Sequence, residues 1–207
     1  MRSLKTILFV VTIGIIAYNS VYFRKLDEYR ASKAGKDFDP AAYARKFWET
    51  RLTPKLDSAV DLTQLISQLS TDPATAFARH SHALGIGNLR YFLVKGTGTV
   101  ESVGTDDVTL VGKNKIRIAT ELIFGNAVRD ASGQININEF VNTMDFNNVS
   151  AEINRIIRET VLPPFRKAVR NGSTVSFTGA IELNKEHLNL EDIELVPIRL
   201  NIIDAEN

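Results

Sequence analysis

The chain has 207 residues, of which 44% are hydrophobic and 24% are charged, and its formal net charge is +1. This composition is typical of a globular protein with one medium domain or two small ones, and it excludes an intrinsically disordered chain. The sequence contains no cysteine, which excludes thiol chemistry and is compatible with an oxidising compartment.

The first segment predicts a membrane anchor or an export signal. Arg2 and Lys5 precede an apolar run over residues 6–23. The run just reaches the length that spans a bilayer, and its densest part would also suit a cleavable signal. Because no small-residue cleavage site follows, we expect residues 1–23 to be an uncleaved anchor in the inner membrane, with the remaining chain on the periplasmic side. Residues 24–38 are polar and are expected to form a stalk.

Residues 39–87 carry helical patterns and are expected to form a helical subdomain. Three acidic residues stand at capping positions before proline or before apolar residues at helical spacing. The three predicted helices start after Asp39, Asp61 and Asp72; the first stops at Thr53-Pro54, and the third runs to Leu84.

From residue 88 onward the pattern changes to the alternation typical of strands. Three strands are followed by a helix that starts at Ser150 as its N-cap, and two strands close the chain. The last strand changes phase at Pro197, which indicates a bulge or an edge strand. The predicted strands cover residues 90–104, 107–112, 115–123, 173–183 and 193–203.

This order matches the OB barrel, in which a helix plugs the barrel between strands 3 and 4. We therefore expect an α+β protein with a five-stranded OB-like antiparallel barrel over residues 88–207. It is preceded by the helical subdomain, the stalk and the membrane anchor helix. Gly96, Gly98 and Gly179 fit such a barrel, because strongly coiled strands need residues without a side chain. An open antiparallel sheet with helices on one face is the alternative.

The stretch from Val128 to Phe140 has part of the spacing of a calcium loop, with Asp130 at position three and Glu139 at position twelve. Position one, normally an aspartate ligand, is Val128. The preceding residues alternate like a strand, whereas a calcium loop of this kind follows a helix. We therefore expect neither a metal site nor a cofactor.

Four residues in this long connection are candidate ligand or partner contacts: Arg129, Asp130, Glu139 and Asn142. A long connection inside a compact domain is usually ordered for a functional reason. Arg129 and Asp130 are interpreted either as a buried ion pair that orients the connection, which we favour, or as a ligand clamp. No nucleophile, phosphate-binding loop or acid–base pair stands out, so no catalytic residue is assigned and an enzyme is not expected.

The same connection carries a G-x-A-x-R-D-A run followed by an F-x-N segment. The run consists of Gly125, Ala127, Arg129, Asp130 and Ala131, and the segment contains Phe140 and Asn142. Together with residues 92–103 and 172–183, this pattern resembles the domain-of-unknown-function family 2291, predicted periplasmic lipoproteins often encoded beside sugar ABC importers. The resemblance implies an envelope location and a transporter component as a protein partner. The family's lipid-bearing cysteine is missing from this sequence.

These observations favour a non-catalytic, membrane-anchored envelope protein that acts as an interaction module for a protein or a small ligand. The resemblance implies an association with a sugar importer. One alternative is a nucleic-acid-binding OB-fold protein. However, residues 88–207 contain 13 Lys and Arg against 16 Asp and Glu, and a phosphate-binding face needs a basic excess. The other alternative is an enzyme or binding protein for a small solute, with a pocket under the loop at residues 125–148.

The anchor is testable on native membranes. Because no cleavage site follows the apolar run, the mature protein should keep its N-terminus and should stay in the membrane pellet after an alkaline wash. N-terminal sequencing of the membrane-bound protein is the measurement. A mature N-terminus near Ser20 or beyond would show that the segment is a cleaved signal.

Overall fold

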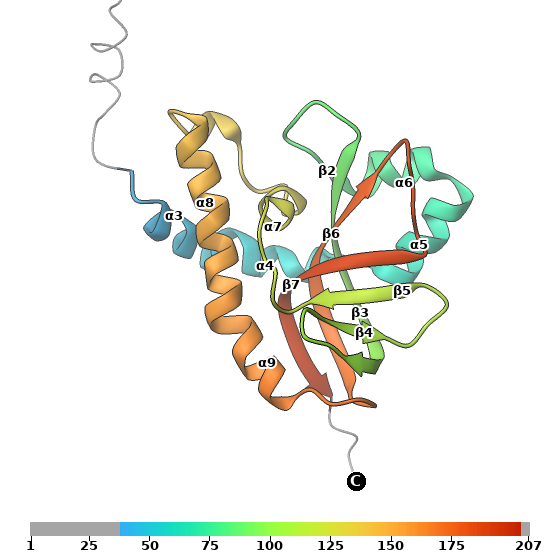
Figure 1. The fold of residues 1–207 in the computed structure, drawn as a ribbon. Coiled ribbons are helices and arrows are strands. Elements are labelled where there is room, and N and C mark those ends of the chain that lie inside the picture. The colour runs from blue at the N-terminus through green and yellow to red at the C-terminus, as the bar shows by residue number, and fades with distance from the viewer. Residues whose placement is uncertain (1–37, 204–207) are drawn as a thin grey trace, which may run out of the picture. The chain divides into compact units, whose positions relative to one another are not determined.

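The computed structural model describes residues 38–203, so the expected anchor and nearly all of the expected stalk lie outside the described residues. Within the described part, no helix is long and apolar enough to cross a membrane. From Asp39 onward, the described residues form one compact unit (Figure 1). Residues 39–87, expected as a helical subdomain, belong to this same unit.

The first helix begins at Pro40 with Asp39 as its cap, as predicted, but it does not stop at Thr53-Pro54. Its turns are α3 (Pro40–Phe47), the π-helical η1 (Trp48–Leu52), α4 (Thr53–Lys55) and the 3-10 helix η2 (Leu56–Ser58). The N–H of Thr53 bonds to the carbonyl of Trp48, five residues back. A proline ring clashes with a carbonyl in a regular α-helix. The wider π turn before Pro54 relieves that clash, so the helix continues.

The next two helices start at their predicted caps. Asp61 accepts from the N–H of Gln64, and Asp72 accepts from the N–H of Thr75. The helix that starts after Asp72 ends earlier than predicted, because the chain becomes extended after His80 and pairs with a long strand. This region comprises β1 (Val60–Asp61), α5 (Leu62–Thr71), α6 (Pro73–His80) and β2 (Ser81–His82).

Five longer strands form a closed circuit of pairings in the order β3-β4-β5-β7-β6, with β6 pairing back to β3. They are β3 (Leu89–Val103), β4 (Asp107–Leu110), β5 (Lys115–Ala119), β6 (Thr174–Asn184) and β7 (Asp192–Ile203). The third predicted strand was expected to reach residue 123, but β5 ends at Ala119. Leu122, which lies beyond this end, is 62% exposed.

The circuit is not purely antiparallel, which corrects the sequence-based expectation. β5 and β7 pair in parallel, and the other four pairings in the circuit are antiparallel. The reason is geometric. Strand direction must alternate around a fully antiparallel ring, and an odd number of strands cannot alternate all the way around.

The long strand β3 bends so that its two edges are covered by different partners. One edge pairs with β6 from Leu89 to Thr99, and the other is covered in turn by β2, β1 and β4. A shift in register near Val100 marks the bend. This arrangement leaves little of the strand open to pairing with another chain.

The bulge predicted in the last strand is confirmed. Thr178 pairs with Arg199 and Gly179 pairs with Pro197, so Ile198 is an extra residue in β7. At this point the strands approach closely, since a Cβ atom on Gly179 would lie 2.5 Å from the carbonyl oxygen of Val196. Only glycine fits at this position without a shift of the backbone.

A long helix connects β5 to β6, the third and fourth of these strands in chain order, but it starts before the predicted cap, Ser150. The side chain of Asn142 accepts from the N–H of Asp145 and caps the helix instead. A π turn again precedes prolines, here Pro163 and Pro164, so the helix runs on. It comprises α8 (Thr143–Ile156), η4 (Ile157–Val161) and α9 (Leu162–Ala168).

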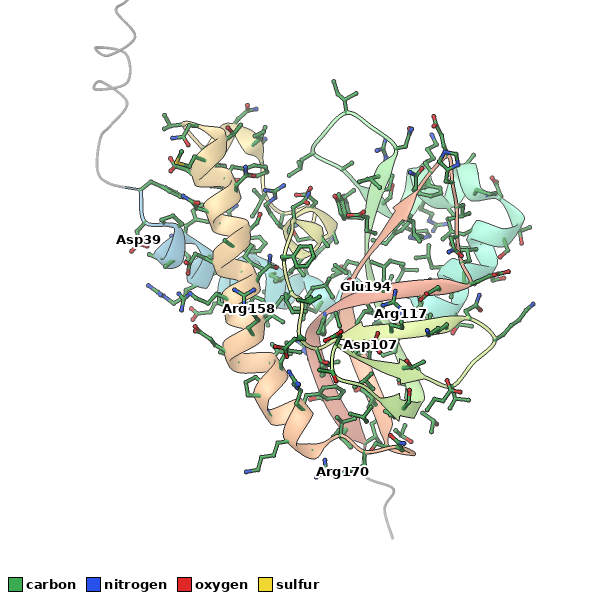
Figure 2. The ribbon with its side chains drawn as sticks, in the orientation of Figure 1. Asp39, Asp107, Arg117, Arg158, Arg170 and Glu194 are labelled. Atoms are coloured by element: carbon green, nitrogen blue, oxygen red, sulfur yellow. The ribbon has the colours of Figure 1, made fainter. Side chains whose placement is uncertain are left out.

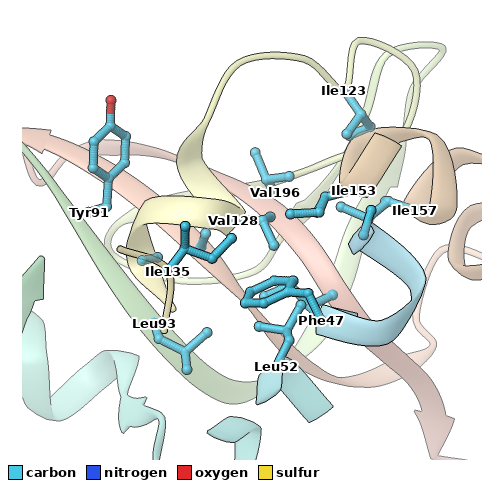
Figure 3. Close-up of a cluster of buried hydrophobic side chains, with 14 of the residues drawn as sticks. Phe47, Leu52, Tyr91, Leu93, Ile123, Val128, Ile135, Ile153, Ile157 and Val196 are labelled. Atoms are coloured by element: carbon cyan, nitrogen blue, oxygen red, sulfur yellow. The ribbon is translucent and has the colours of Figure 1, made fainter. Parts of the chain in front are cut away.

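Two hydrophobic clusters hold the unit together. The inner cluster takes side chains from every strand of the circuit, among them Val94, Val108, Ile118, Val175 and Leu195. The outer cluster lies between the other face of the sheet and the helices (Figure 3), and it includes Phe47, Leu52, Leu93, Val128, Ile153, Ile157 and Val196. The long helix was expected to plug the circuit. It packs mainly in the outer cluster and reaches the inner one only at its end, through Phe165 and Val169.

Candidate functional site

The connection between β5 and the long helix is ordered around two short helices, α7 (Ala127–Ala131) and the 3-10 helix η3 (Ile137–Glu139). The sequence pattern predicted a loop here, because helices this short carry no periodicity. The four candidate residues all lie in or next to this connection, yet the structure does not bring them to one site. Arg129 and Asp130 form one pair, while Glu139 and Asn142 have separate partners.

Arg129 and Asp130 form a buried ion pair. The Nε atom of Arg129 lies 2.6 Å from Oδ1 of Asp130, and the two side chains are 5% and 3% exposed. The second carboxylate oxygen of Asp130 accepts a hydrogen bond from the amide of Asn126, which also donates to the hydroxyl of Tyr91. Because a buried charge without a partner is strongly destabilising, each member of this network holds the others in place.

The guanidinium of Arg129 also joins α7 to α8. Its Nη1 atom donates to the hydroxyl of Ser150 at 2.9 Å and to the carbonyl of Phe146 at 3.4 Å. The guanidinium carbon lies 3.5 Å from the centroid of the Phe146 ring, which is a cation–π contact. Ser150, predicted as a helix cap, is thus a buried acceptor inside the helix.

Glu139 lies in a separate and more exposed network with the first helix. Its Oε2 atom lies 2.9 Å from Nη2 of Arg51 and accepts from the hydroxyl of Tyr43 at 2.8 Å. Its Oε1 atom accepts from the N–H of Asn136, which completes a capping box for η3. The hydrogen bonds from Arg51 lower the pKa of Glu139 to about 2. Burial and the hydrogen bond to Glu139 raise the pKa of Tyr43 to about 12.

The calcium-like spacing from Val128 does not form an open loop. Asp130 is buried in its ion pair, Glu139 is held by Arg51, and Asn142 caps α8. Both carboxylates of the motif are therefore engaged by donors from the protein. Across residues 38–203, no group of three or more His, Cys, Asp or Glu side chains is arranged to hold a metal ion.

A pocket of about 520 Å³ opens between the long helix and the chain that follows β5. We call it the Arg129 pocket. One wall consists of residues 123–126 together with Arg129. The other wall is a stripe of the long helix formed by Asn147, Ser150, Ala151, Asn154 and Arg158.

Two side chains of the long helix tie the two walls together. The Nδ2 atom of Asn154 donates to the carbonyl of Gly125 at 2.9 Å, and Nη1 of Arg158 donates to the carbonyl of Ile123. Figure 2 shows Arg158 on the long helix. These bonds satisfy carbonyls of a segment that has left the sheet and has no strand partner.

Three buried polar side chains keep unused hydrogen-bonding atoms at the pocket. Arg129, Ser150 and Asn154 are 5%, 7% and 4% exposed. Among the described residues, none provides a partner for Nη2 of Arg129, the hydroxyl hydrogen of Ser150 or Oδ1 of Asn154. Within residues 38–203, the fully enclosed side-chain atoms that have no hydrogen-bond partner belong to Gln68 and His80, which do not line this pocket. Because Nη2 of Arg129 and Oδ1 of Asn154 are not among these enclosed atoms, they are accessible, and both residues line the pocket together with Ser150.

The sequence pattern identified Arg129 but missed the opposite wall. Asn147, Ser150, Asn154 and Arg158 are spaced three or four residues apart, so they share one face of a helix. The signal was a polar stripe beside the apolar stripe of the same helix. It was hidden because the helix was expected to start at Ser150, which left Asn147 in a loop.

The ion pair can be tested by chemical denaturation. Arg129→Ala leaves Asp130 buried with only Asn126 as partner and should lower the free energy of unfolding by about 3 to 5 kcal/mol. Arg129→Met combined with Asp130→Leu should recover part of this loss, because no charge then stays buried. The control, Arg79→Ala on the exposed face of α6, should stay within about 0.5 kcal/mol of wild type. If the denaturation midpoint of Arg129→Ala equals that of wild type, the pair does not stabilise the fold.

The Glu139 network should make stability depend on acid pH. Its pKa is lowered from an ordinary value of 4.5 to about 2, so its contribution is present above about pH 4.5 and is lost as the pH falls toward 2. Glu139→Gln should therefore destabilise the protein at pH 7 by about 1 kcal/mol or less, and the difference from wild type should vanish near pH 2. Urea unfolding at several pH values measures this. Glu186→Gln, at an exposed position, is the control, and a pH-independent difference for Glu139→Gln would contradict the assignment.

Comparison with known proteins places this geometry in a family. No curated protein gave a significant match. The chain is similar to an OB-fold protein from Thermotoga maritima with a known crystal structure, at 28% sequence identity and a TM-score of 0.73, covering 81% of this chain and 100% of that one. The family model described as predicted periplasmic lipoprotein (DUF2291) matches residues 11–201. The resemblance noted in the sequence is thereby confirmed: the chain belongs to the predicted periplasmic lipoprotein family DUF2291.

Proposed function

We propose that the chain is a non-catalytic binding module of the cell envelope that holds a small polar solute in the Arg129 pocket. The strand circuit, in this proposal, is an OB-type barrel that serves as a scaffold, and the apolar N-terminal run keeps the protein at the membrane. The family description supports an envelope location. The OB-fold relative supports the scaffold assignment.

The observation that carries the proposal is the set of unused polar atoms in the pocket. Buried polar groups in proteins nearly always have partners, because an unsatisfied one is costly. Arg129, Ser150 and Asn154 line the same cavity and are each more than nine-tenths buried, yet within the described residues Nη2 of Arg129, the hydroxyl hydrogen of Ser150 and Oδ1 of Asn154 have no partner. A solute that fills this cavity would satisfy all three atoms at once. The pocket volume of about 520 Å³ is in the range of small-molecule sites.

The chemistry of the pocket wall supports binding without catalysis. Its side chains offer guanidinium, amide and hydroxyl groups, but no carboxylate, imidazole or thiol. Such groups donate and accept hydrogen bonds, yet none exchanges protons readily near neutral pH. Ser150 has no adjacent base, since its hydroxyl faces the guanidinium of Arg129.

Blocking the pocket tests the proposal. Ala151 is an exposed residue of α8 that lines the pocket, so Ala151→Trp fills the cavity without burying a new group in the core. The full chain in detergent is dialysed against a small-molecule extract of its own cells, and retained solutes are identified by mass spectrometry. We expect at least one solute that is retained by wild type and lost with Ala151→Trp.

The matched control is Ala78→Trp, at an exposed position of α6 away from the pocket. It should retain the same solute as wild type. Retention that is equal in the two tryptophan variants would place binding outside the Arg129 pocket. The absence of any retained solute would overturn the proposed function.

A further inference from the structure

We infer that the solute in the Arg129 pocket carries an oxyanion, either a carboxylate or a phosphate group, that is bound between Arg129 and Arg158. This inference rests on the proposed binding function and adds the chemical class of the ligand. It follows from the charge balance of the pocket wall, from its supply of hydrogen-bond donors and from its apolar rim.

The charge of the pocket wall is positive. Two guanidinium groups line the pocket and no carboxylate does. The charge of Arg129 is matched by Asp130, which lies behind it and does not line the pocket. Arg158 forms no ion pair within the described residues, and its bond to the Ile123 carbonyl leaves its charge unmatched. The wall therefore carries about one net positive charge, which favours a monoanionic group.

The unused hydrogen-bonding groups are mainly donors. Within the described residues, Nη2 of Arg129 and the hydroxyl hydrogen of Ser150 have no acceptor, and Arg158 has further N–H groups beyond the one that bonds to Ile123. Guanidinium groups bind planar carboxylates and phosphates with paired hydrogen bonds. Oδ1 of Asn154 is a single acceptor, which suits a hydroxyl group next to the oxyanion.

The rim of the pocket supplies an apolar surface. Phe124 lines the pocket and is 73% exposed, and Ala151 of α8 lines the same pocket. A large exposed aromatic ring beside polar groups is typical of a site that also contacts the carbon skeleton of its ligand. The ligand is thus an oxyanion attached to a small organic body.

The experiment uses simple probes on the full chain in detergent micelles. Acetate and acetamide have the same shape but differ in charge, and inorganic phosphate represents the second source of oxyanion. Backbone amide NMR spectra are recorded during titration with each probe. We expect acetate or phosphate to shift signals of α7 and α8 with an affinity about tenfold or more above that of acetamide. The anion that binds with the higher affinity identifies whether the group is a carboxylate or a phosphate.

Neighbouring asparagines provide a matched pair of variants. Asn147 and Asn148 are both exposed on α8, but only Asn147 lines the pocket. Asn147→Asp places a carboxylate in the pocket wall and should weaken binding of the anion by about tenfold, with no change in fold. Asn148→Asp adds the same charge to the same helix turn and should leave the affinity close to that of wild type.

Equal weakening by the two variants would show a general charge effect and overturn the assigned site. If neither acetate nor phosphate binds more tightly than acetamide, the oxyanion assignment is overturned. If a neutral solute is retained in the dialysis experiment and is lost with Ala151→Trp, the proposed binding function stands while this inference fails.

Discussion

The closure of five strands into one circuit is the constraint on which the rest of the structure depends. With the order β3-β4-β5-β7-β6, the strand that follows β5 in the chain is not its neighbour in space, because β7 occupies that place. The chain must therefore leave the sheet after β5 and return two positions away. The long connection that results contains α7, η3 and the whole long helix, and the Arg129 pocket lies inside it.

The long helix serves two purposes through two different stripes. One stripe is apolar, with Ile153 and Ile157, and packs with the first helix in the outer cluster. The other stripe is polar, and its Asn154 and Arg158 hold the carbonyls of the chain after β5. Because the apolar stripe fixes the helix against the sheet, the polar stripe is held at a constant distance from α7. Such fixed walls are what a binding site requires to keep its groups in place before the ligand arrives.

The two charged networks of the connection differ in their consequences for the protein. The Arg129–Asp130 pair is enclosed and the loss of one member would leave a buried charge, and Arg129 also joins α7 to α8 through Ser150 and Phe146. The Glu139 network with Arg51 and Tyr43 is about one-third exposed and is screened by water, so it fastens the far end of the connection more weakly. The connection is thus held firmly at the pocket and more loosely at η3.

The sequence by itself determined the class of the fold, the capped helix starts at Asp39, Asp61 and Asp72, the bulge at Pro197 and the family. These features depend on local chemistry: capping side chains, period-two alternation and short motifs act within a few residues of one another. It also identified Arg129 and Asp130 as an ion pair, because opposite charges next to each other in a long ordered connection can orient that connection.

Only the tertiary structure decided the rest. The parallel pairing of β5 with β7 follows from closing an odd ring, which no single segment encodes. The π turns that carry the helices past Pro54 and Pro163 depend on packing that makes continuation favourable. The pocket itself joins Arg129 to Asn154 and Arg158, which are far apart in the chain and meet only because both α7 and α8 pack on the outer face of the sheet. The polar stripe of α8 has helical spacing in the sequence, but its position opposite Arg129 is set by packing and leaves no periodic trace, so the site could not be assembled from the sequence.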